Sequence, residues 1–414
     1  MRALVFNPTI PRFLVTKALG TVSRAAVMAR TSALQFREIP EPPLPGDEWV
    51  RIGVRLGGIC GSDLHTIRLE TSPAMSALTS FPFVLGHENV GAVLEAGRAV
   101  PTLRPGQRVT VEPVLPCAAR GVPACPLCAA GRYNLCVRTT EGHLSPGLMI
   151  GACRDTGGSW SASFVAHRSQ VLSIPDGVTD EGALMAEPMA CAVHPLLSSP
   201  PPDRSTVLVI GGGVIGQCAI AAVRAVGSNA RIVALVRYPF QGEAARRQGA
   251  NTVVLLRRGD RYYAEMADVV GGTLRRPMIG RRVLIGGADL TIECVGSGRS
   301  LDDALRLTAP GGRVILLGLA AVPSGVDWTP IWWKELRVTG SYVYGIEQWQ
   351  GRTAKTMELV LAWMARGDLH LDHLVTHRFP LDAYRDALRT AMGKAESKAF
   401  KVVFEPNAKA KPST

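Results

Sequence analysis

Two groups of residues in the sequence have the composition of zinc sites. The first contains Cys60, in the run Gly-Ile-Cys-Gly-Ser-Asp-Leu-His, and the later pair His87-Glu88. The second is a set of four cysteines that lie close together in the chain: Cys117, Cys125, Cys128 and Cys136. Four thiolate ligands fill the coordination positions of a zinc ion, which then serves a structural role. A thiolate, an imidazole and a carboxylate together can leave one coordination position open for substrate. The sequence therefore predicts a metalloenzyme that also carries a separate structural metal.

A glycine-rich turn in the middle of the chain predicts a dinucleotide site. A strand-like apolar run over 207–210 leads directly into the turn, and a helical segment over 217–226 follows it. In this setting the first glycine permits a tight turn, the second lets the backbone approach a pyrophosphate, and the third permits close helix packing. The start of the helix supplies unpaired N–H groups to the phosphates. The residues expected to contact the cofactor are Gly211, Gly213, Val214, Ile215 and Gly216.

Arg237, which follows the next strand-like run, favours NADP over NAD. An NAD site usually carries an acid about 20 residues beyond the glycines, and Arg237 stands at that place. A planar guanidinium can pair with the 2′-phosphate of NADP, which an acid would repel. The alternative is that Arg237 is a solvated loop residue and that the protein discriminates little between NADP and NAD.

Length and composition predict two domains in a reducing setting. The chain has 414 residues, of which 47% are hydrophobic and 19% charged, which is enough for two ordinary cores. The nine cysteines do not suit a secreted disulfide framework in a chain of this size, so we expect a cytoplasmic protein. No apolar run reaches the roughly 20 residues that cross a bilayer, so no membrane partner is expected.

The net charge of +12 raises the question of a nucleic-acid partner. The basic residues are dispersed in short pairs rather than gathered in one stripe, so no such partner is expected. A net positive charge instead favours binding of a phosphate-bearing cofactor. The N-terminal 37 residues contain Arg and Ser but no acid, as in a transit peptide. The competing interpretation is a strand over 1–6, an insertion over 7–33, and a second strand over 34–38.

Strand-like runs after the glycine turn alternate with helical segments and predict a doubly wound parallel sheet. These runs cover residues 231–236, 253–256, 290–294, 314–317 and 337–339. The stretch 259–288 is longer than a simple connection, and we expect a helix with an extra loop or hairpin there.

The motifs, taken in order, make the sequence resemble the zinc-dependent medium-chain alcohol and polyol dehydrogenase family over nearly its whole length. They are Gly58 to His65, Gly86-His87-Glu88, the cysteine quartet, Glu187-Pro188 and the glycine turn. The resemblance implies an α/β fold in which a GroES-like, β-rich catalytic domain is interrupted by a Rossmann domain. The expected bounds are 1–189 and 344–414 for the catalytic domain, including a frayed tail, and 190–343 for the Rossmann domain. The active site would lie in the cleft between them.

The resemblance also implies the ligands of a catalytic zinc. Cys60 and His87 match ligand positions, and Glu187 matches the place where polyol dehydrogenase-like members have Glu instead of Cys. Glu88 either binds the metal directly or sits just behind it. Thiolate, imidazole and carboxylate are all accepted zinc ligands, which supports this set independently.

Three residues close to Cys60 are expected to support the catalytic zinc site. Asp63 would hold the ring of His87 by accepting its other N–H, and its alternative role is a turn cap after Cys60. Ser62 and His65 resemble the family's proton-relay pair, although His65 could instead be a surface residue.

The quartet departs from the spacing that the family usually shows, C-x2-C-x2-C-x7-C. Cys125, Cys128 and Cys136 fit its last three positions, but Val122 occupies the first and Cys117 lies eight residues before Cys125. A bulge of the loop 118–124 would let Cys117 reach the metal, since longer loops add little closure cost. The alternative is an empty or three-thiolate site with a free Cys117.

These features together predict a zinc-dependent oxidoreductase with two zinc ions per chain, one catalytic and one structural. It would transfer a hydride between a secondary alcohol or polyol-like substrate and NADP, with NAD as the alternative cofactor. The metal would favour loss of the hydroxyl proton, and the nicotinamide would accept the hydride. The resemblance suggests a homodimer or homotetramer. The alternative is a catalytically silent dinucleotide-binding sensor or scaffold.

Overall fold

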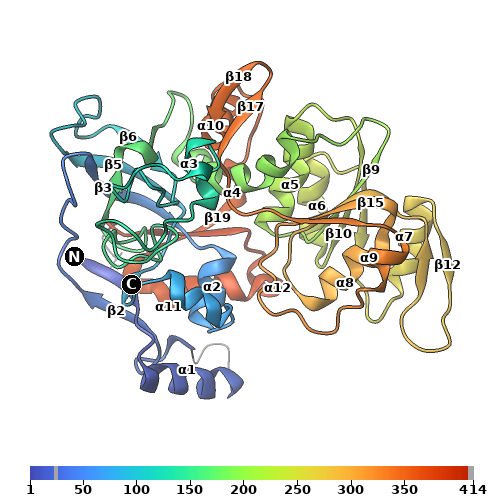
Figure 1. Ribbon diagram of the computed structural model, residues 1–414. Coiled ribbons are helices and arrows are strands. Elements are labelled where there is room, and N and C mark those ends of the chain that lie inside the picture. The colour runs from blue at the N-terminus through green and yellow to red at the C-terminus, as the bar shows by residue number, and fades with distance from the viewer. Residues whose placement is uncertain (23–26, 409–414) are drawn as a thin grey trace. The chain divides into compact units, whose positions relative to one another are not determined.

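The computed structural model describes residues 1–22 and 27–408 (Figure 1). The chain forms two compact units. One consists of Met1–Glu187 with Met357–Thr414, and the other of Pro188–Thr356. No helix within the described ranges is long and apolar enough to span a membrane.

The first unit is built on a seven-stranded sheet of order β19-β20-β3-β5-β6-β8, with β7 also paired to β3. One edge of the long strand β3 pairs with β5, and β7 and β20 share its other edge. Burial of Val50, Ile52 and Val54 in β3 forms a core with β6 and β7. The strands are β3 (Trp49–Gly58), β5 (Asn89–Ala96), β6 (Arg108–Val111), β7 (Ser163–His167), β8 (Val171–Ser173), β19 (Val375–Pro380) and β20 (Lys401–Glu405).

A second, three-stranded sheet of order β2-β1-β4 lies in the same unit. Its strands are β1 (Arg2–Phe6), β2 (Leu34–Glu38) and β4 (Phe83–Val84). β1 and β2 pair antiparallel, and helix α1 (Ile10–Val22) lies between them in the chain, so residues 1–6 and 34–38 form strands as predicted. The other helices of this unit are α2 (Gly61–Ile67), α3 (Pro126–Ala129), α10 (Thr356–Ala365), α11 (Tyr384–Met392) and α12 (Lys394–Ser397). Helix α4 (Asp180–Leu197) begins in this unit and ends in the second one. Short 3-10 turns lie at Pro73–Leu78, Tyr133–Leu135, Arg168–Gln170, Asp372–Leu374 and Leu381–Ala383.

The second unit contains a six-stranded parallel sheet of order β11-β10-β9-β14-β15-β16 (Figure 1). Its strands are β9 (Thr206–Ile210), β10 (Arg231–Val236), β11 (Thr252–Leu255), β14 (Ala288–Glu293), β15 (Thr308–Leu316) and β16 (Arg337–Gly340). The connecting helices are α5 (Val214–Ala225), α6 (Pro239–Arg247), α7 (Tyr262–Val270), α8 (Gly298–Leu307) and α9 (Thr329–Trp333). The chain begins at β9 and winds outward in both directions, so the direction of winding reverses between β9 and β14. The predicted doubly wound parallel sheet is confirmed.

Two hairpins extend the second unit. The stretch 259–288 contains α7 and the hairpin of β12 (Thr273–Arg275) and β13 (Val283–Ile285), as predicted. The other hairpin joins β17 (Ile346–Trp349) and β18 (Arg352–Lys355). Its Glu347 accepts hydrogen bonds from Thr356 at 2.8 Å and pairs with Nδ1 of His194 at 2.5 Å. Because these bonds tie the hairpin to the second unit, that unit extends to Thr356 rather than to the expected residue 343.

Candidate active site and structural metal site

Cys60 and Asp63 are positioned by the junction between β3 and α2. Cys60 is the N-cap residue of α2, and its N–H donates to Oδ2 of Asp63 at 2.9 Å. The other oxygen of Asp63 lies 3.4 Å from Nδ1 of His87. Asp63 thus occupies both positions considered from the sequence, the turn cap and the partner of the His87 ring.

Cys60, His87 and Glu88 form a group whose potential ligand atoms all lie within 4.8 Å of one another. The group is assembled by strand pairing, because Gly57 of β3 lies opposite Asn89 of β5. Cys60 follows the end of β3, and His87 and Glu88 precede the start of β5. Sulfur, imidazole nitrogen and carboxylate oxygen fit a zinc ion with room for a further ligand.

Lys401 completes the charge balance of this group. Its Nζ lies 2.5 Å from both carboxylate oxygens of Glu88, and both side chains are buried. Lys401 reaches this position because β20 pairs with the end of β3. Gly58 provides the space, since a Cβ there would lie only 2.0 Å from Oε2 of Glu88. The carboxylate is therefore fixed in place by a buried cation.

Glu187 lies in α4 and is buried, with 6% of its surface exposed. It does not belong to the group of Cys60, His87 and Glu88 among the residues that the structure describes. It is near enough to Lys401 to contribute to that residue's charge environment. Burial alone would lower the pKa of Lys401, but Glu88, Cys60 and Glu187 outweigh it and raise that pKa. Lys401 thus contacts Glu88 directly and is also influenced by the charge of Glu187.

His87 shows the sign of the local electrostatic field. Its burial would lower its pKa, but the charges of Asp63 and Cys60 outweigh that effect and raise the pKa well above its ordinary value. The surroundings therefore favour positive charge at this point, which is also what a divalent cation requires.

Ser62 and His65 lie on the same short helix, three residues apart and both half-buried. Nδ1 of His65 lies 3.0 Å from Oε2 of Glu70, and the other oxygen of Glu70 lies 2.5 Å from Nη2 of Arg68. If Nδ1–H donates to Glu70, Nε2 of His65 is left free to accept a proton.

The turn after α2 holds Glu70 beside His65. The N–H of Glu70 donates to the carbonyl of His65 at 2.8 Å, and the N–H of Leu69 donates to that of Thr66 at 3.0 Å. Leu69 adopts a left-handed conformation with φ of 56°. This is the Schellman arrangement that ends many helices, usually with glycine at the left-handed position. A leucine there costs about 1–2 kcal/mol, which the surrounding contacts must offset.

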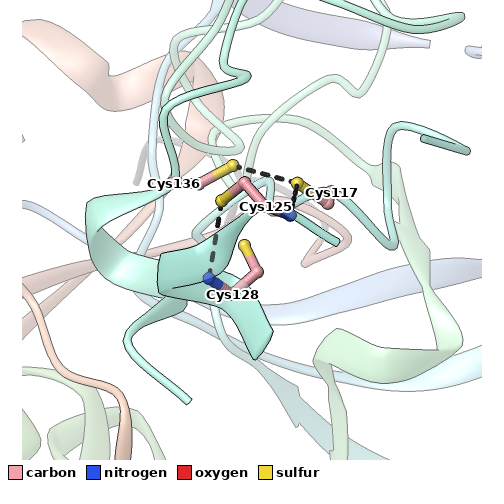
Figure 2. A group of neighbouring side chains, drawn as sticks. All are labelled: Cys117, Cys125, Cys128 and Cys136. Atoms are coloured by element: carbon pink, nitrogen blue, oxygen red, sulfur yellow. Dashed lines mark hydrogen bonds between the residues drawn. The ribbon is translucent and has the colours of Figure 1, made fainter. Parts of the chain in front are cut away.

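The cysteine quartet converges on one point, and Figure 2 shows its four sulfur atoms gathered together. All four lie within 4.8 Å of one another, and Sγ of Cys117 is 3.5 Å from that of Cys136. Tetrahedral coordination with Zn–S bonds of about 2.3 Å places sulfurs about 3.8 Å apart, so the group fits a zinc ion. Cys117 thus joins the other three despite its unusual spacing.

Backbone N–H groups point at two of these sulfurs. The N–H of Cys125 donates to Cys117, and that of Cys128 donates to Cys125. The latter bond lowers the pKa of Cys125 to about 6, whereas burial raises the pKa of Cys128 and of Cys136. The quartet therefore favours at least one thiolate before any metal binds.

The glycine turn joins β9 to α5 at the point where the winding of the sheet reverses. Gly211 has φ of +110°, and a Cβ on Gly216 would lie 1.8 Å from the carbonyl oxygen of Gly211. Gly213 is the N-cap residue, and α5 starts at Val214, earlier than the sequence predicted. The free N–H groups of this first turn, including that of Ile215, suit the phosphates of a dinucleotide.

Arg237 is exposed and directly follows β10. Its backbone N–H donates to Oε1 of Gln241 at 3.2 Å, and its guanidinium lies 5.4 Å from the ring centre of Tyr238. Among the residues that the structure describes, no carboxylate oxygen lies within 4.0 Å of this guanidinium, which suits it to meet an anionic group.

Comparisons with known proteins identify the family. Residues 46–176 match the alcohol dehydrogenase GroES-like domain, and residues 214–359 match the zinc-binding dehydrogenase domain. An L-threonine 3-dehydrogenase of Anaeromyxobacter sp. (strain K) is 32% identical over 84% of this chain and 89% of its own. The chain belongs to the zinc-dependent medium-chain dehydrogenase family. The predicted family and the predicted fold class, a GroES-like domain with a Rossmann sheet, are thereby confirmed.

Two further proteins resemble the chain over nearly its full length. A sorbitol dehydrogenase of Bombyx mori is 30% identical over 91% of this chain and 98% of its own. The solved structure of a zinc-binding dehydrogenase from Sinorhizobium meliloti 1021, bound to NADP, is 26% identical. It superposes with a TM-score of 0.69 and covers 98% of this chain and 99% of that one.

Sequence reasoning missed three residues of these sites: Lys401, Glu70 and Arg120, a buried residue in the loop between Cys117 and Cys125. Lys401 lies within the apolar run Ala-Phe-Lys-Val-Val-Phe, and a charge inside such a strand is a signal of a buried partner. Glu70 and Arg120 carry no comparable signal, because their contacts depend on turns that the sequence does not reveal.

Proposed function

We propose that this protein is a zinc-dependent dehydrogenase that transfers a hydride between an alcohol and NADP. The observation that carries the proposal is the convergence of Cys60, His87 and Glu88 in a chain of this family. The substrate class that we favour is a secondary alcohol or polyol. The names of two relatives, sorbitol dehydrogenase and L-threonine 3-dehydrogenase, support a small hydroxylated substrate.

We propose that Cys60, His87 and one carboxylate hold the catalytic zinc. Glu88 is favoured as the third ligand because its oxygens lie within the group, and Glu187 is the alternative that the sequence suggested. A bound zinc ion would supply Lewis acidity that lowers the pKa of the substrate hydroxyl. Zinc content separates the two carboxylates: Glu88→Gln should lose the catalytic zinc and Glu187→Gln should retain it. The opposite result would make Glu187 the ligand.

The protein's own residues then orient the substrate and move its proton. Asp63 would hold the ring of His87 through Nδ1, which leaves Nε2 as the nitrogen that would bind the metal, and Lys401 would hold the carboxylate of Glu88. Ser62 would accept the hydroxyl proton while donating its own proton to His65, and His65 would pass that proton toward solvent, with Glu70 holding the imidazole. The glycine turn from Gly211 to Gly216 would bind the pyrophosphate of the cofactor.

Arg237 supports NADP over NAD, and the NADP-bound relative is consistent with that choice. A charge-assisted pair with the 2′-phosphate contributes about 1.5–3 kcal/mol, so Arg237→Ala should weaken NADP binding by about ten- to a hundredfold. NAD affinity should stay the same, and both are measured by fluorescence titration. Arg246→Ala, which removes an exposed arginine of α6, is the matched control. Equal losses for NADP and NAD would refute the cofactor assignment.

The decisive experiment combines metal analysis with turnover. The proposal expects two zinc ions per chain and reduction of NADP by members of a panel of secondary alcohols and polyols. A dinucleotide-binding protein without catalytic zinc and without turnover would instead be a sensor or scaffold. We expect a homodimer or homotetramer from the family resemblance, which light scattering measures.

A further inference from the structure

Arg120 is a buried cation beside the cysteine quartet. Its side chain is fully buried, at 0% exposure, and it lies in the loop between Cys117 and Cys125. Within the described parts of the chain, no carboxylate oxygen lies within 4.0 Å of its guanidinium. Its donors instead bind main-chain carbonyls, and its Nε has no partner. The accepting carbonyls belong to Glu141, Leu144, Ser145 and Gly147.

The carbonyl bonds solvate this cation but do not neutralise it. Arginine keeps its charge near neutral pH, and a buried charge is costly unless it is paired. Cys153 does not supply the missing charge, because burial raises the pKa of its thiol. Asp155 is only half-buried, and its carboxylate accepts the N–H of Ser145 at 2.6 Å. The structure therefore contains a buried positive charge that lacks a close anionic partner.

The cysteine quartet supplies the opposite imbalance once it holds a metal. Four thiolates around one zinc ion leave a net charge of about −2 in a buried site. Arg120 lies three residues after Cys117, and its N–H donates to the carbonyl of Cys117 at 3.1 Å. Burial lowers the pKa of Arg120, and the groups that oppose this effect by their charge are Cys153, Cys136, Asp155 and Cys117. A single buried cation next to this site would offset part of its charge.

We propose that Arg120 is the counter-cation of the four-thiolate zinc site and fixes Cys117 as its fourth ligand. This inference rests on the proposed structural zinc. It assigns a purpose to the altered spacing, because the extra residues between Cys117 and Cys125 are those that carry Arg120.

The local backbone supports this role of the loop. The N–H of Arg120 donates to the carbonyls of Pro116 and Cys117, and its own carbonyl accepts the N–H of His143 at 3.2 Å. A Cβ on Gly142 would lie 2.1 Å from that carbonyl, so the glycine permits the close approach. Within the loop 118–124, Ala119 and Arg120 are buried, whereas Ala118, Gly121, Pro123 and Ala124 are exposed. The loop therefore bulges into solvent but turns the side chain of Arg120 inward, and Cys117 at its start lies beside the other three sulfurs.

The test measures zinc binding at the quartet alone, in full-length protein carrying Cys60→Ser to remove the catalytic zinc. Zinc affinity is measured by competition with a chromogenic chelator, and zinc release by its rate of transfer to that chelator. Arg120→Met removes the charge, Arg120→Lys retains it, and Asp155→Asn removes the other nearby charge as a control. Arg120→Met should weaken zinc binding by at least about tenfold and speed release, with Arg120→Lys intermediate and Asp155→Asn near the parent.

The outcomes separate the two proposals. If Arg120 only stabilises the fold through its hydrogen bonds to main-chain carbonyls, its variants will unfold at lower temperature but bind zinc as tightly as the parent. That result overturns the inference. If Arg120→Met does not fold, the zinc affinities of Arg120→Lys and Asp155→Asn are compared instead. Weaker zinc binding by Arg120→Lys than by Asp155→Asn supports the inference, and equal binding overturns it. If the parent itself binds no zinc at the quartet, the proposed structural zinc fails before any arginine variant is compared.

Discussion

The two candidate metal sites are built by the chain in different ways. The quartet comes from one short segment, 117–136, whose turns and N–H···S bonds are local. Cys60, His87, Glu88 and Lys401 come from distant segments that meet because β3 pairs with both β5 and β20. The geometry of the quartet therefore depends on local loops, whereas that of the mixed site depends on the tertiary fold.

The two sites also differ in how charge is balanced. In the mixed site, a buried lysine contacts a buried carboxylate directly, at 2.5 Å. Around the quartet, the buried arginine contacts only carbonyl oxygens. The buried carboxylate of the first site therefore has a cation of the protein beside it, whereas the buried cation beside the quartet has no carboxylate partner within 4.0 Å among the described residues. This contrast predicts distinct responses to single substitutions.

The largest effect should follow Cys60→Ser. Loss of a ligand from the mixed site should reduce turnover by at least about ten-thousandfold, because the Lewis acid contributes several kcal/mol to the reaction. NADP affinity should remain largely intact, since the glycine turn belongs to the other compact unit. Steady-state kinetics and cofactor titration test both statements. A fully active variant would contradict the site assignment.

Cys117→Ser should produce the reverse pattern. The quartet should lose its zinc and the protein should unfold at a lower temperature, because metal binding contributes folding free energy at such sites. Turnover per folded molecule should change little. Zinc analysis, calorimetry and active-site titration measure these quantities. Loss of turnover without loss of stability would show that the two sites do not divide their roles in this way.

Lys401→Met tests charge balance in the mixed site. Leaving Glu88 buried without its cation should lower the free energy of unfolding by about 3–5 kcal/mol. The double variant Lys401→Met with Glu88→Gln should recover part of that loss, because it removes the unpaired charge. Urea unfolding of metal-free protein measures both. If the double variant is no more stable than Lys401→Met alone, the pair is not coupled.

The smallest effect concerns the carboxylate behind His65. Glu70→Ala should lower kcat by about three- to tenfold with KM for NADP unchanged, because one hydrogen bond that orients the imidazole is lost. The nitrogen chemical shifts of His65 should report loss of the Nδ1–H tautomer. Arg68→Gln, which leaves the His65–Glu70 contact in place, is the control. An unchanged tautomer in Glu70→Ala would exclude the orienting role.

Local patterns in the sequence were sufficient for the Rossmann sheet. The run 207–216 predicts strand, turn and helix because buried parallel strands are continuously apolar and the glycines serve a particular turn. The hairpin within 259–288 was also predictable, because that connection is too long for a single helix. The start of α5 was predicted late, since the glycine turn leads straight into the helix at Val214.

The mixed site was only partly predictable. The residue types at Cys60 and His87 indicated a metal, but the sequence favoured Glu187 as the carboxylate and left Glu88 open. The structure brings Glu88 into the group and adds Lys401, whose contact with Glu88 spans 313 residues of sequence. No local periodicity reports a contact of that separation.

The sequence by itself determined which donor atoms this protein has, their order along the chain and the turn that suits a dinucleotide. These properties depend on residue type and on neighbours a few positions away. Only the tertiary structure decided which carboxylate lies beside Cys60 and His87, and which cations lie beside each metal site. The physical reason is that the cost of burying a charge depends on the groups around it, and strand pairing brings those groups from distant parts of the chain.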